Sequence, residues 1–272
     1  MKIPKSMSIK RCHGLGNVVL LLPALDYLRQ KRGLQVNLVT RNEWINAFST
    51  LRPHLNVITQ NNTGTIDLDL LTVDVSPGHH RIDEFAQLLG IDKMLPAPHV
   101  DVPAAWKKPF EQLSGSIIFA PEAAHPSRRW PLENCRRVKG LFPDRNLVLV
   151  GTKNAPEIAC DVDLRGKLNL EGLFGVVALS SVVITMDSAV LHIASAVGIP
   201  TVAIFGGVDF RFRIRKEQPV VVLQSKMDCC PCNKNETCEG RYECIKGITI
   251  EDVRKAVNDA VKLSKFLQLE FV

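Results

Sequence analysis

Apolar runs and amphipathic segments alternate along the whole chain. Short continuous apolar stretches, such as residues 181–186 (SVVITM) and 200–207 (PTVAIFGG), are typical of strands that are covered on both faces. Between them lie segments with apolar positions at helical spacing, such as residues 170–180 and 188–198. This alternation predicts an α/β protein built from parallel sheets.

The same pattern divides the chain in two. The predicted strands are residues 7–12, 35–40, 56–60, 68–75, 116–120, 146–151, 181–186 and 200–207, and the predicted helices are residues 18–33, 42–51, 81–91, 131–142, 170–180, 188–198 and 248–267, the last capped by Thr249. From about residue 92 to 114 the pattern stops, and four prolines indicate a linker. We therefore expect two Rossmann-like, doubly wound domains, residues 1–105 and 115–272, facing each other across a cleft.

Composition narrows the class of protein. The contents of 46% hydrophobic and 23% charged residues are those of a soluble globular protein, and no apolar run approaches the roughly 20 residues of a membrane span. The apolar stretch near the start lacks a signal-peptide cleavage site, so we expect a cytoplasmic protein. The net charge of +6 favours anionic partners, which include nucleotides, phospholipid surfaces touched peripherally and nucleic acid.

The stretch 185–207 carries more polar groups than a core helix needs. Asp187 and Ser188 fall at a predicted strand-to-helix junction, and His192 follows one turn later on the same side. Ligands of open α/β sheets bind at such junctions, where free backbone N–H groups favour a phosphate. The alternative is that Asp187 or Ser188 is an ordinary cap and His192 a core histidine.

Three segments together resemble a known family. HGLGNVVLLLPAL (residues 13–25), RRWPLENC (128–135) and DSAVLHIASAVGIPTVAIFGG (187–207) are similar, in this order, to motifs of the heptosyltransferase-like glycosyltransferases, family nine. The resemblance implies the two-domain arrangement called GT-B and a nucleotide-sugar donor such as ADP-heptose. It covers the chain from about residue 8 onward.

The resemblance also implies a set of site residues. Those assigned to donor binding are Gly14, Gly16, Arg128, Asp187, Ser188, Ala189 and His192. Arg128 would neutralise charge on the leaving diphosphate, assisted by backbone N–H groups at Ser188 and Ala189. Asp187 would accept hydrogen bonds from sugar hydroxyls, and the glycines would form a tight turn that admits acceptor and sugar.

One departure from the family concerns the catalytic base. Where the family usually has an aspartate that deprotonates the acceptor hydroxyl, this chain has Asn17. An amide can orient an acceptor but cannot take its proton at neutral pH. His13 could serve as base instead, because imidazole titrates near neutrality; the alternative is an ordinary loop histidine.

The sequence thus supports a glycosyltransferase that moves a heptose-like sugar to a bacterial glycan, lipid-linked or lipopolysaccharide-core-like acceptor. The alternatives are transfer to nucleic acid or protein, and a non-catalytic nucleotide-sugar-binding module. Arg211, Arg213 and Arg215 would share one face if the segment were extended, and could then contact an anionic acceptor or the donor phosphate; the alternative is a solvated loop or edge strand. The Gly-Leu-Gly-Asn turn lacks the third glycine of a dinucleotide fingerprint, which disfavours an oxidoreductase.

Five of the eight cysteines crowd into one segment, residues 229–244, which we call the cysteine finger. Its spacing suits a tetrahedral structural metal site, zinc before iron, formed by Cys229, Cys232, Cys238 and Cys244. A similar segment in part of the resembling family is a metal finger, and this analogy selects Cys229 over Cys230. Two disulfides or free thiols are the alternatives, whereas Cys12, Cys135 and Cys160 are expected to be buried structural thiols.

Overall fold

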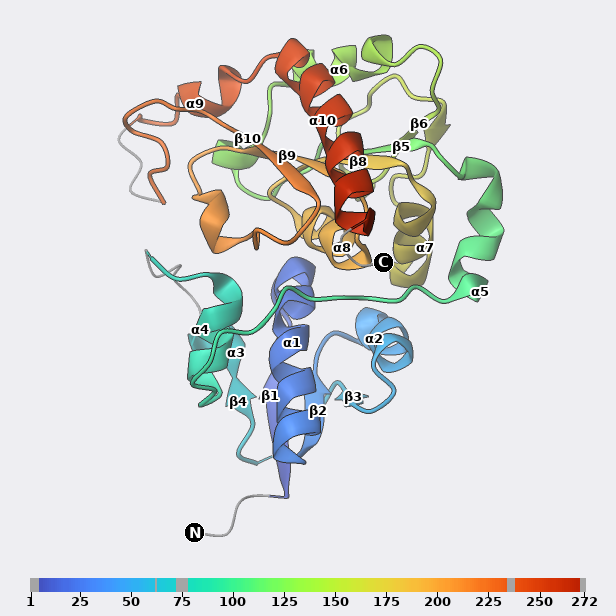
Figure 1. Ribbon diagram of the computed structural model, residues 1–272. Helices are drawn as coiled ribbons and strands as arrows, with labels where there is room; N and C mark the ends of the chain where they lie inside the picture. Colours follow the sequence, from blue (N-terminus) through green and yellow to red (C-terminus); the bar gives the residue numbers. More distant parts are fainter. Residues whose placement is uncertain (1–4, 62, 72–77, 234–237, 270–272) are drawn as a thin grey trace. The chain divides into compact units, whose positions relative to one another are not determined.

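The chain folds into two compact units, Met1–Asp101 and Val102–Val272. The computed structural model describes residues 5–61, 63–71, 78–233 and 238–269 (Figure 1). The boundary between the units falls inside the expected linker. Part of that linker is helical, because Ala104–Lys107 forms helix α5 and Lys108–Leu113 forms the 3-10 helix η2.

The first unit is a parallel sheet with helices. Its elements are β1 (Ser6–Lys10), α1 (Leu15–Arg32), β2 (Gln35–Val39), η1 (Asn42–Trp44), α2 (Ile45–Leu51), β3 (Asn56–Ile58), β4 (Ile66–Asp67), α3 (Leu68–Leu71) and α4 (Arg81–Leu88). The strand order is β3-β2-β1-β4. Strands β2 and β3 are added on one side of β1, and β4 is added on its other side, so the order of the parallel strands reverses between β1 and β4. Helix α1 packs against α4 and is apolar and buried along most of its first half.

The start of α1 depends on a glycine. Gly14 precedes the helix with a φ of 76°, a left-handed conformation that a side chain would disfavour. A Cβ atom on Gly14 would also lie 2.9 Å from Nδ2 of Asn17. The helix begins at Leu15, three residues earlier than predicted, so Gly16 and Asn17 lie in its first turn and not in the turn before it.

One predicted strand of the first unit is wrong. Residues 68–75 were expected to be extended, but β4 ends at Asp67 and Leu68–Leu71 is helical, while residues 72–75 lie outside the described part of the chain. The carboxylate of Asp67 explains the change, because it accepts hydrogen bonds from the backbone N–H groups of Asp69 and Leu70. This local capping starts a helix where the apolar pattern suggested a strand.

The second unit is a larger parallel sheet. In addition to α5 and η2 its elements are β5 (Ile117–Ala120), η3 (Pro126–Arg128), α6 (Leu132–Leu141), β6 (Leu147–Leu149), β7 (Val162–Asp163), α7 (Leu170–Leu179), β8 (Val182–Met186), α8 (Ala189–Val197), β9 (Thr201–Phe205), η4 (Phe210–Phe212), β10 (Val220–Gln224), α9 (Glu243–Lys246) and α10 (Ile250–Leu269). The order β10-β9-β8-β5-β6-β7 is that of a Rossmann sheet, which reverses between β5 and β8.

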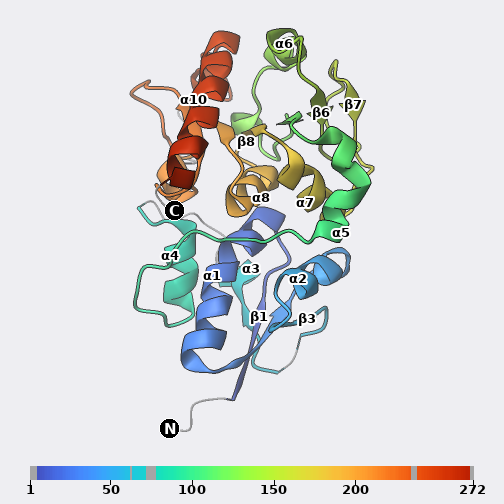
Figure 2. The same cartoon turned by 45° about the vertical axis from the view of Figure 1, so that its right-hand side comes forward.

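Helices cover both faces of this sheet. Helices α6 and α10 pack on one face, and α7 and α8, with α5 against α7, pack on the other (Figures 1 and 2). Strands β5, β8 and β9 are fully buried, as their continuous apolar runs predicted. The predicted cap of the last helix is confirmed, since Oγ1 of Thr249 accepts the backbone N–H of Asp252. No helix within the described ranges is both long and apolar enough to cross a membrane.

The pattern missed the short strands β7 and β10 and misjudged the arginine segment. Residues 210–212 form the 3-10 helix η4 rather than an extended strand, because the side chain of Asp209 accepts the backbone N–H of Arg211. The side chain of Arg211 is 72% exposed, whereas Arg213 is buried. These arginines therefore do not share one face.

Candidate active site

The point where the second sheet reverses brings together two predicted donor residues. Arg128 lies in η3, in the connection after β5, and Asp187 follows β8 directly. Nη1 of Arg128 is 3.4 Å from Oδ2 of Asp187, and the Asp187 side chain is only 3% exposed. Within the described residues, Oδ2 of Asp187 accepts no hydrogen bond. A buried carboxylate oxygen that has a cation nearby but accepts no hydrogen bond can still accept hydrogen bonds from the hydroxyl groups of a ligand.

Helix α8 begins at the same place. Ser188 is its N-cap residue, but its hydroxyl lies 3.1 Å from Oγ1 of Thr185 and forms no capping hydrogen bond. The first backbone N–H groups of α8 therefore have no side-chain cap, which suits an anion. His192 lies one turn into this helix and is buried. The alternative that Ser188 is an ordinary cap does not hold.

A close backbone contact sets the position of the Arg128 segment. A Cβ atom placed on Gly206, which follows β9, would lie 1.8 Å from the carbonyl oxygen of Ser127. Only glycine permits this approach, because real Cβ contacts essentially never fall below 3.0 Å. Sequence reasoning missed this contact, since Gly206 and Ser127 are far apart in the chain.

The reversal point of the first sheet carries the two residues predicted to be catalytic, His13 and Asn17, and the two glycines predicted to bind the donor, Gly14 and Gly16. His13 follows β1 and is exposed, and its backbone N–H donates to Oδ1 of Asp69 at 3.0 Å. The other oxygen of Asp69 accepts the N–H of Cys12 at 2.9 Å, and Arg11 lies 3.5 Å from the same carboxylate. Asp69 thus fixes the turn before α1, a role that its sequence context did not reveal.

The structure therefore gathers the predicted residues into two groups. Arg128, Asp187, Ser188 and His192 come together around the start of α8 in the second unit. The group in the first unit, around the start of α1, consists of His13, Gly14, Gly16 and Asn17. Both groups lie at the carboxyl ends of parallel strands, beside a reversal of strand order, where α/β proteins bind ligands.

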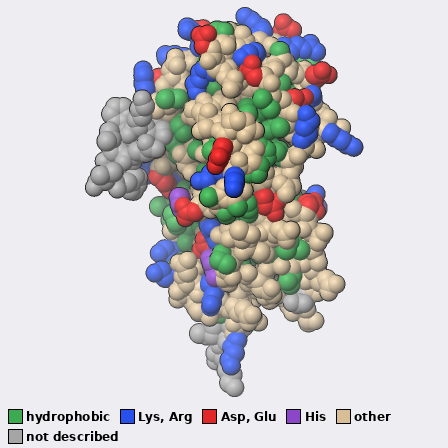
Figure 3. Space-filling model, turned by 90° about the vertical axis from the view of Figure 1, so that its right-hand side faces the viewer, with side chains coloured by type: hydrophobic (Ala, Val, Ile, Leu, Met, Phe, Trp, Pro, Cys, Tyr) green, Lys and Arg blue, Asp and Glu red, His purple; other side chains and the backbone are tan. Residues whose placement is uncertain are grey.

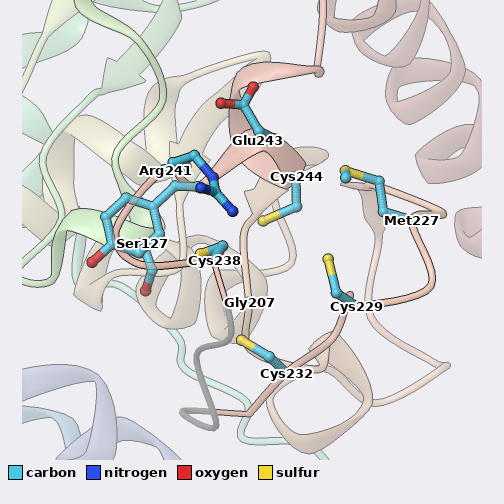
Figure 4. Close-up of a pocket in the computed structure, with 10 residues that line it drawn as sticks. Ser127, Gly207, Met227, Cys229, Cys232, Cys238, Arg241, Glu243 and Cys244 are labelled. Atoms are coloured by element: carbon cyan, nitrogen blue, oxygen red, sulfur yellow. The ribbon is translucent and has the colours of Figure 1, made fainter.

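The cysteine finger forms one wall of a pocket. The pocket is lined by Ser127, Gly207, Met227, Arg241, Tyr242, Glu243 and the four predicted ligands Cys229, Cys232, Cys238 and Cys244 (Figure 4). All eight cysteines are free thiols, and among the described residues no three Cys, His, Asp or Glu side chains are gathered closely enough to hold a metal ion. Burial and the neighbouring Cys244, Cys232 and Cys229 raise the pKa of the fifth thiol, Cys230, to about 12.

The three isolated cysteines differ from one another. Cys135 is buried, as expected, and burial raises its pKa to about 12. Cys12 and Cys160 are only half-buried, so the expectation of buried thiols is wrong for them. Each lies just beyond or before a strand, where the chain approaches the surface.

Solved structures with the same fold are glycosyltransferases. A family 9 glycosyl transferase from Veillonella parvula DSM 2008 aligns with a TM-score of 0.76 at 18% identity, covering 96% of this chain and 98% of that one. The iron-containing dodecameric glycosyltransferase TibC from enterotoxigenic E. coli H10407 gives 0.76 at 14%, covering 96% and 77%. The ADP-heptose lps heptosyltransferase II of E. coli gives 0.64 at 15%, covering 96% and 99%. The fold is thus that of GT-B glycosyltransferases, with two parallel α/β sheets.

The family follows from the sequence itself. The model of glycosyltransferase family 9 (heptosyltransferase) matches residues 79–243, more than half of the chain. The chain therefore belongs to this family and is a nucleotide-sugar-dependent glycosyltransferase. The matched region includes the Arg128 segment, the start of α8 and most of the cysteine finger. A comparison with curated proteins gave no match.

Proposed function

We propose that this protein transfers a heptose-like sugar from an ADP-heptose-like donor to a bacterial glycan acceptor of the lipopolysaccharide-core type. The observation that carries the proposal is the Arg128–Asp187 pair beside the uncapped start of α8. A cation, free N–H groups and a buried carboxylate at one point match a sugar diphosphate, which offers phosphate oxygens and hydroxyl groups. In one TibC structure the bound ligand is ADP-D-beta-D-heptose.

Each donor-site residue then has a distinct task. Arg128 and the N–H groups of Ser188 and Ala189 stabilise the negative charge that develops on the departing diphosphate. Asp187 accepts hydrogen bonds from the sugar hydroxyls and holds the anomeric carbon for attack. His192 lies on the same side of α8 and contributes to the floor of the donor pocket.

On the acceptor side, we propose that His13 removes the proton from the attacking hydroxyl and Asn17 orients it. His13 is exposed on a turn whose backbone is fixed by Asp69, so its imidazole can reach an acceptor. Asn17 stands beside Gly14 at the start of α1, where Nδ2 can donate a hydrogen bond. Gly14 leaves the turn before α1 free of a side chain so that the acceptor can approach, whereas Gly16 is buried in the first turn of that helix.

We also propose that the cysteine finger holds one structural metal ion, iron or zinc. The chemistry of the donor set supports this, because Cys229, Cys232, Cys238 and Cys244 line one pocket and thiolates suit both metals; to bind an ion, the thiols would have to draw closer together than they lie among the described residues. TibC, which shares the fold, is described as iron-containing. Crowded thiols with raised pKa values are costly to ionise without a cation, and an ion would remove that cost. The ion would cross-link the finger and takes no part in sugar transfer.

The face drawn in Figure 3 offers little support for a nucleic-acid acceptor. On the face drawn in Figure 3, the Lys and Arg side chains of the described residues are interspersed with Asp and Glu. A nucleic-acid site would gather them into a continuous basic stripe. The net charge of +6 also suits an anionic donor and an anionic glycan.

The proposed function is tested by identifying the sugar and its destination. Nucleotide-sugars retained by the purified native protein are identified by mass spectrometry, and the labelled donor is then offered with a lipopolysaccharide core preparation, a protein mixture or single-stranded DNA. We expect an ADP-linked sugar and label in the glycan alone. Label in protein or DNA but not in glycan would overturn the proposed acceptor, and donor binding without any transfer would indicate a binding module.

A further inference from the structure

Asn233 of the cysteine finger makes two hydrogen bonds to the loop after β9, residues 206–209, and the thiol of Cys230 donates a third, to the carbonyl oxygen of Gly206 at 3.4 Å. The backbone N–H of Asn233 donates to the carbonyl oxygen of Gly207 at 2.7 Å. In return, the backbone N–H of Asp209 donates to the side-chain Oδ1 of Asn233 at 2.8 Å. Two reciprocal hydrogen bonds therefore join the finger to the edge of the sheet where the donor site lies.

The same loop is held from its other side and touches the Arg128 segment. Nε2 of Gln224 on β10 donates to the carbonyl oxygens of Gly206 at 2.8 Å and Val208 at 2.6 Å. Gly206 is the residue whose Cα lies against the Ser127 carbonyl, and Ser127 directly precedes Arg128. Ser127 and Gly207 also line the pocket that the finger cysteines surround (Figure 4). A displacement of the loop must therefore shift the backbone next to Arg128.

The loop also fixes the position of an exposed arginine, Arg211. Asp209, which is buried, receives Nε and Nη2 of Arg211 on its two carboxylate oxygens, at 3.0 and 2.6 Å. The guanidinium group is thereby fixed at the surface, just beyond the carboxyl end of β9. Because the backbone N–H of Asp209 donates a hydrogen bond to Asn233, the finger also determines the position of the Arg211 guanidinium group.

We propose that Asn233 is a positioning residue for the donor site. It fixes the loop 206–209 and, through Gly206 and Ser127, the distance between Arg128 and Asp187. This inference rests on the proposed donor role of that pair. It gives the finger a function in substrate binding in addition to bracing the fold, because Asn233, a finger residue, holds the loop that contacts the Arg128 segment.

Asn233 combines two properties that substitutions can separate. Its φ of 48° is left-handed, which asparagine and glycine tolerate better than other residues. Its side chain supplies the acceptor for Asp209. Asn233→Gly keeps the backbone conformation and removes the acceptor, whereas Asn233→Asp keeps an acceptor oxygen. Glu239 provides a matched control, because it is also left-handed, with a φ of 50°, and its exposed side chain pairs with Arg241 within the finger.

The experiment compares donor affinity in four proteins that contain the full chain: wild type, N233G, N233D and E239G. ADP-heptose is titrated calorimetrically, and melting temperature and the number of reactive thiols are measured on the same samples. N233G should weaken the donor Kd about threefold to tenfold, the factor expected for one lost net hydrogen bond. N233D should bind close to wild type, and E239G should bind like wild type, because glycine suits the left-handed conformation at position 239 and the substitution removes no contact with the loop. In transfer assays the loss should appear in the KM for the donor.

Two results would overturn the inference: wild-type donor affinity in folded N233G, or equal losses of affinity in N233G and E239G, which would reflect a glycine anywhere in the finger and not the Asn233 side chain. Arg128→Ala, titrated in parallel, separates this failure from that of the donor site. If Arg128→Ala weakens binding and N233G does not, the coupling is wrong. If neither weakens binding, the donor-site assignment is wrong.

Discussion

The structure makes its most detailed prediction for the substitution Gly206→Ala. The new Cβ atom would meet the Ser127 carbonyl oxygen at 1.8 Å, where contacts below 3.0 Å essentially never occur. The two nearest atoms, the carbonyl oxygen and carbon of Ser127, belong to the backbone and cannot rotate away. The loop after β9 and the segment before Arg128 must therefore separate by more than about 1 Å. Because Nη1 of Arg128 is 3.4 Å from Oδ2 of Asp187, this shift is large enough to misalign the pair.

The magnitude follows from what the pair would lose. A hydrogen bond to a charged partner contributes about 1.5–3 kcal/mol, which corresponds to roughly a tenfold to 150-fold weaker donor Kd. Overpacking should also lower the free energy of unfolding by about 1–3 kcal/mol. We therefore expect a folded but less stable protein with impaired donor binding.

The assay is calorimetric titration of ADP-heptose into Gly206→Ala, with Gly140→Ala as a control. Gly140 lies in α6, and a Cβ atom there would meet nothing within 4 Å. The control should bind donor like wild type. A folded Gly206→Ala protein with wild-type donor affinity would refute the reasoning that the contact with Ser127 positions Arg128.

Three further predictions concern the base, the finger and pH. His13→Ala should abolish transfer while preserving donor binding, whereas Asn17→Asp should preserve or raise the rate; full activity in His13→Ala would exclude it as base. Elemental analysis of protein purified without chelator should find about one metal per chain, and Cys232→Ser should lose both metal and thermal stability; metal-free wild-type protein with fully reactive thiols would contradict this. Hydrogen bonds from Arg165 lower the pKa of Asp163 to about 2 from its ordinary 3.8. The pair therefore stabilises the fold above about pH 4, and the contribution is lost as the pH falls toward 2, so Asp163→Asn should unfold more easily than wild type at pH 6 and equally at pH 2.

The hydrophobic pattern predicted the elements that bury the most surface. Strands β5, β8 and β9 and helices α1, α7 and α8 lie where the pattern placed them, because continuous apolar runs require cover on both faces. It failed at residues 68–71 and at η4, where the carboxylates of Asp67 and Asp209 cap short helical turns. Such capping competes with weak strand propensity over only a few residues, and the period of apolar positions does not record it.

The site could be predicted in part for a similar reason. Asp187 and Ser188 stand at a strand-to-helix junction, and any parallel α/β fold directs that junction toward a ligand. The pairing of Asp187 with Arg128 depends on β5 and β8 being neighbours, which the order of strands in the chain does not reveal. The contacts made by Gly206 and Asn233 join segments that are distant in the sequence, so only the folded structure shows them.

The central claim is that Arg128 and Asp187 form the donor site. The most direct measurement is the Kd for ADP-heptose in Arg128→Ala, Asp187→Asn and the double variant, with Arg254→Ala as a control that removes an exposed arginine paired with Glu251. We predict that each single variant weakens the Kd by roughly tenfold or more, that the double variant loses less than the product of the two, and that the control binds like wild type. Folded single variants with wild-type donor affinity would contradict the claim.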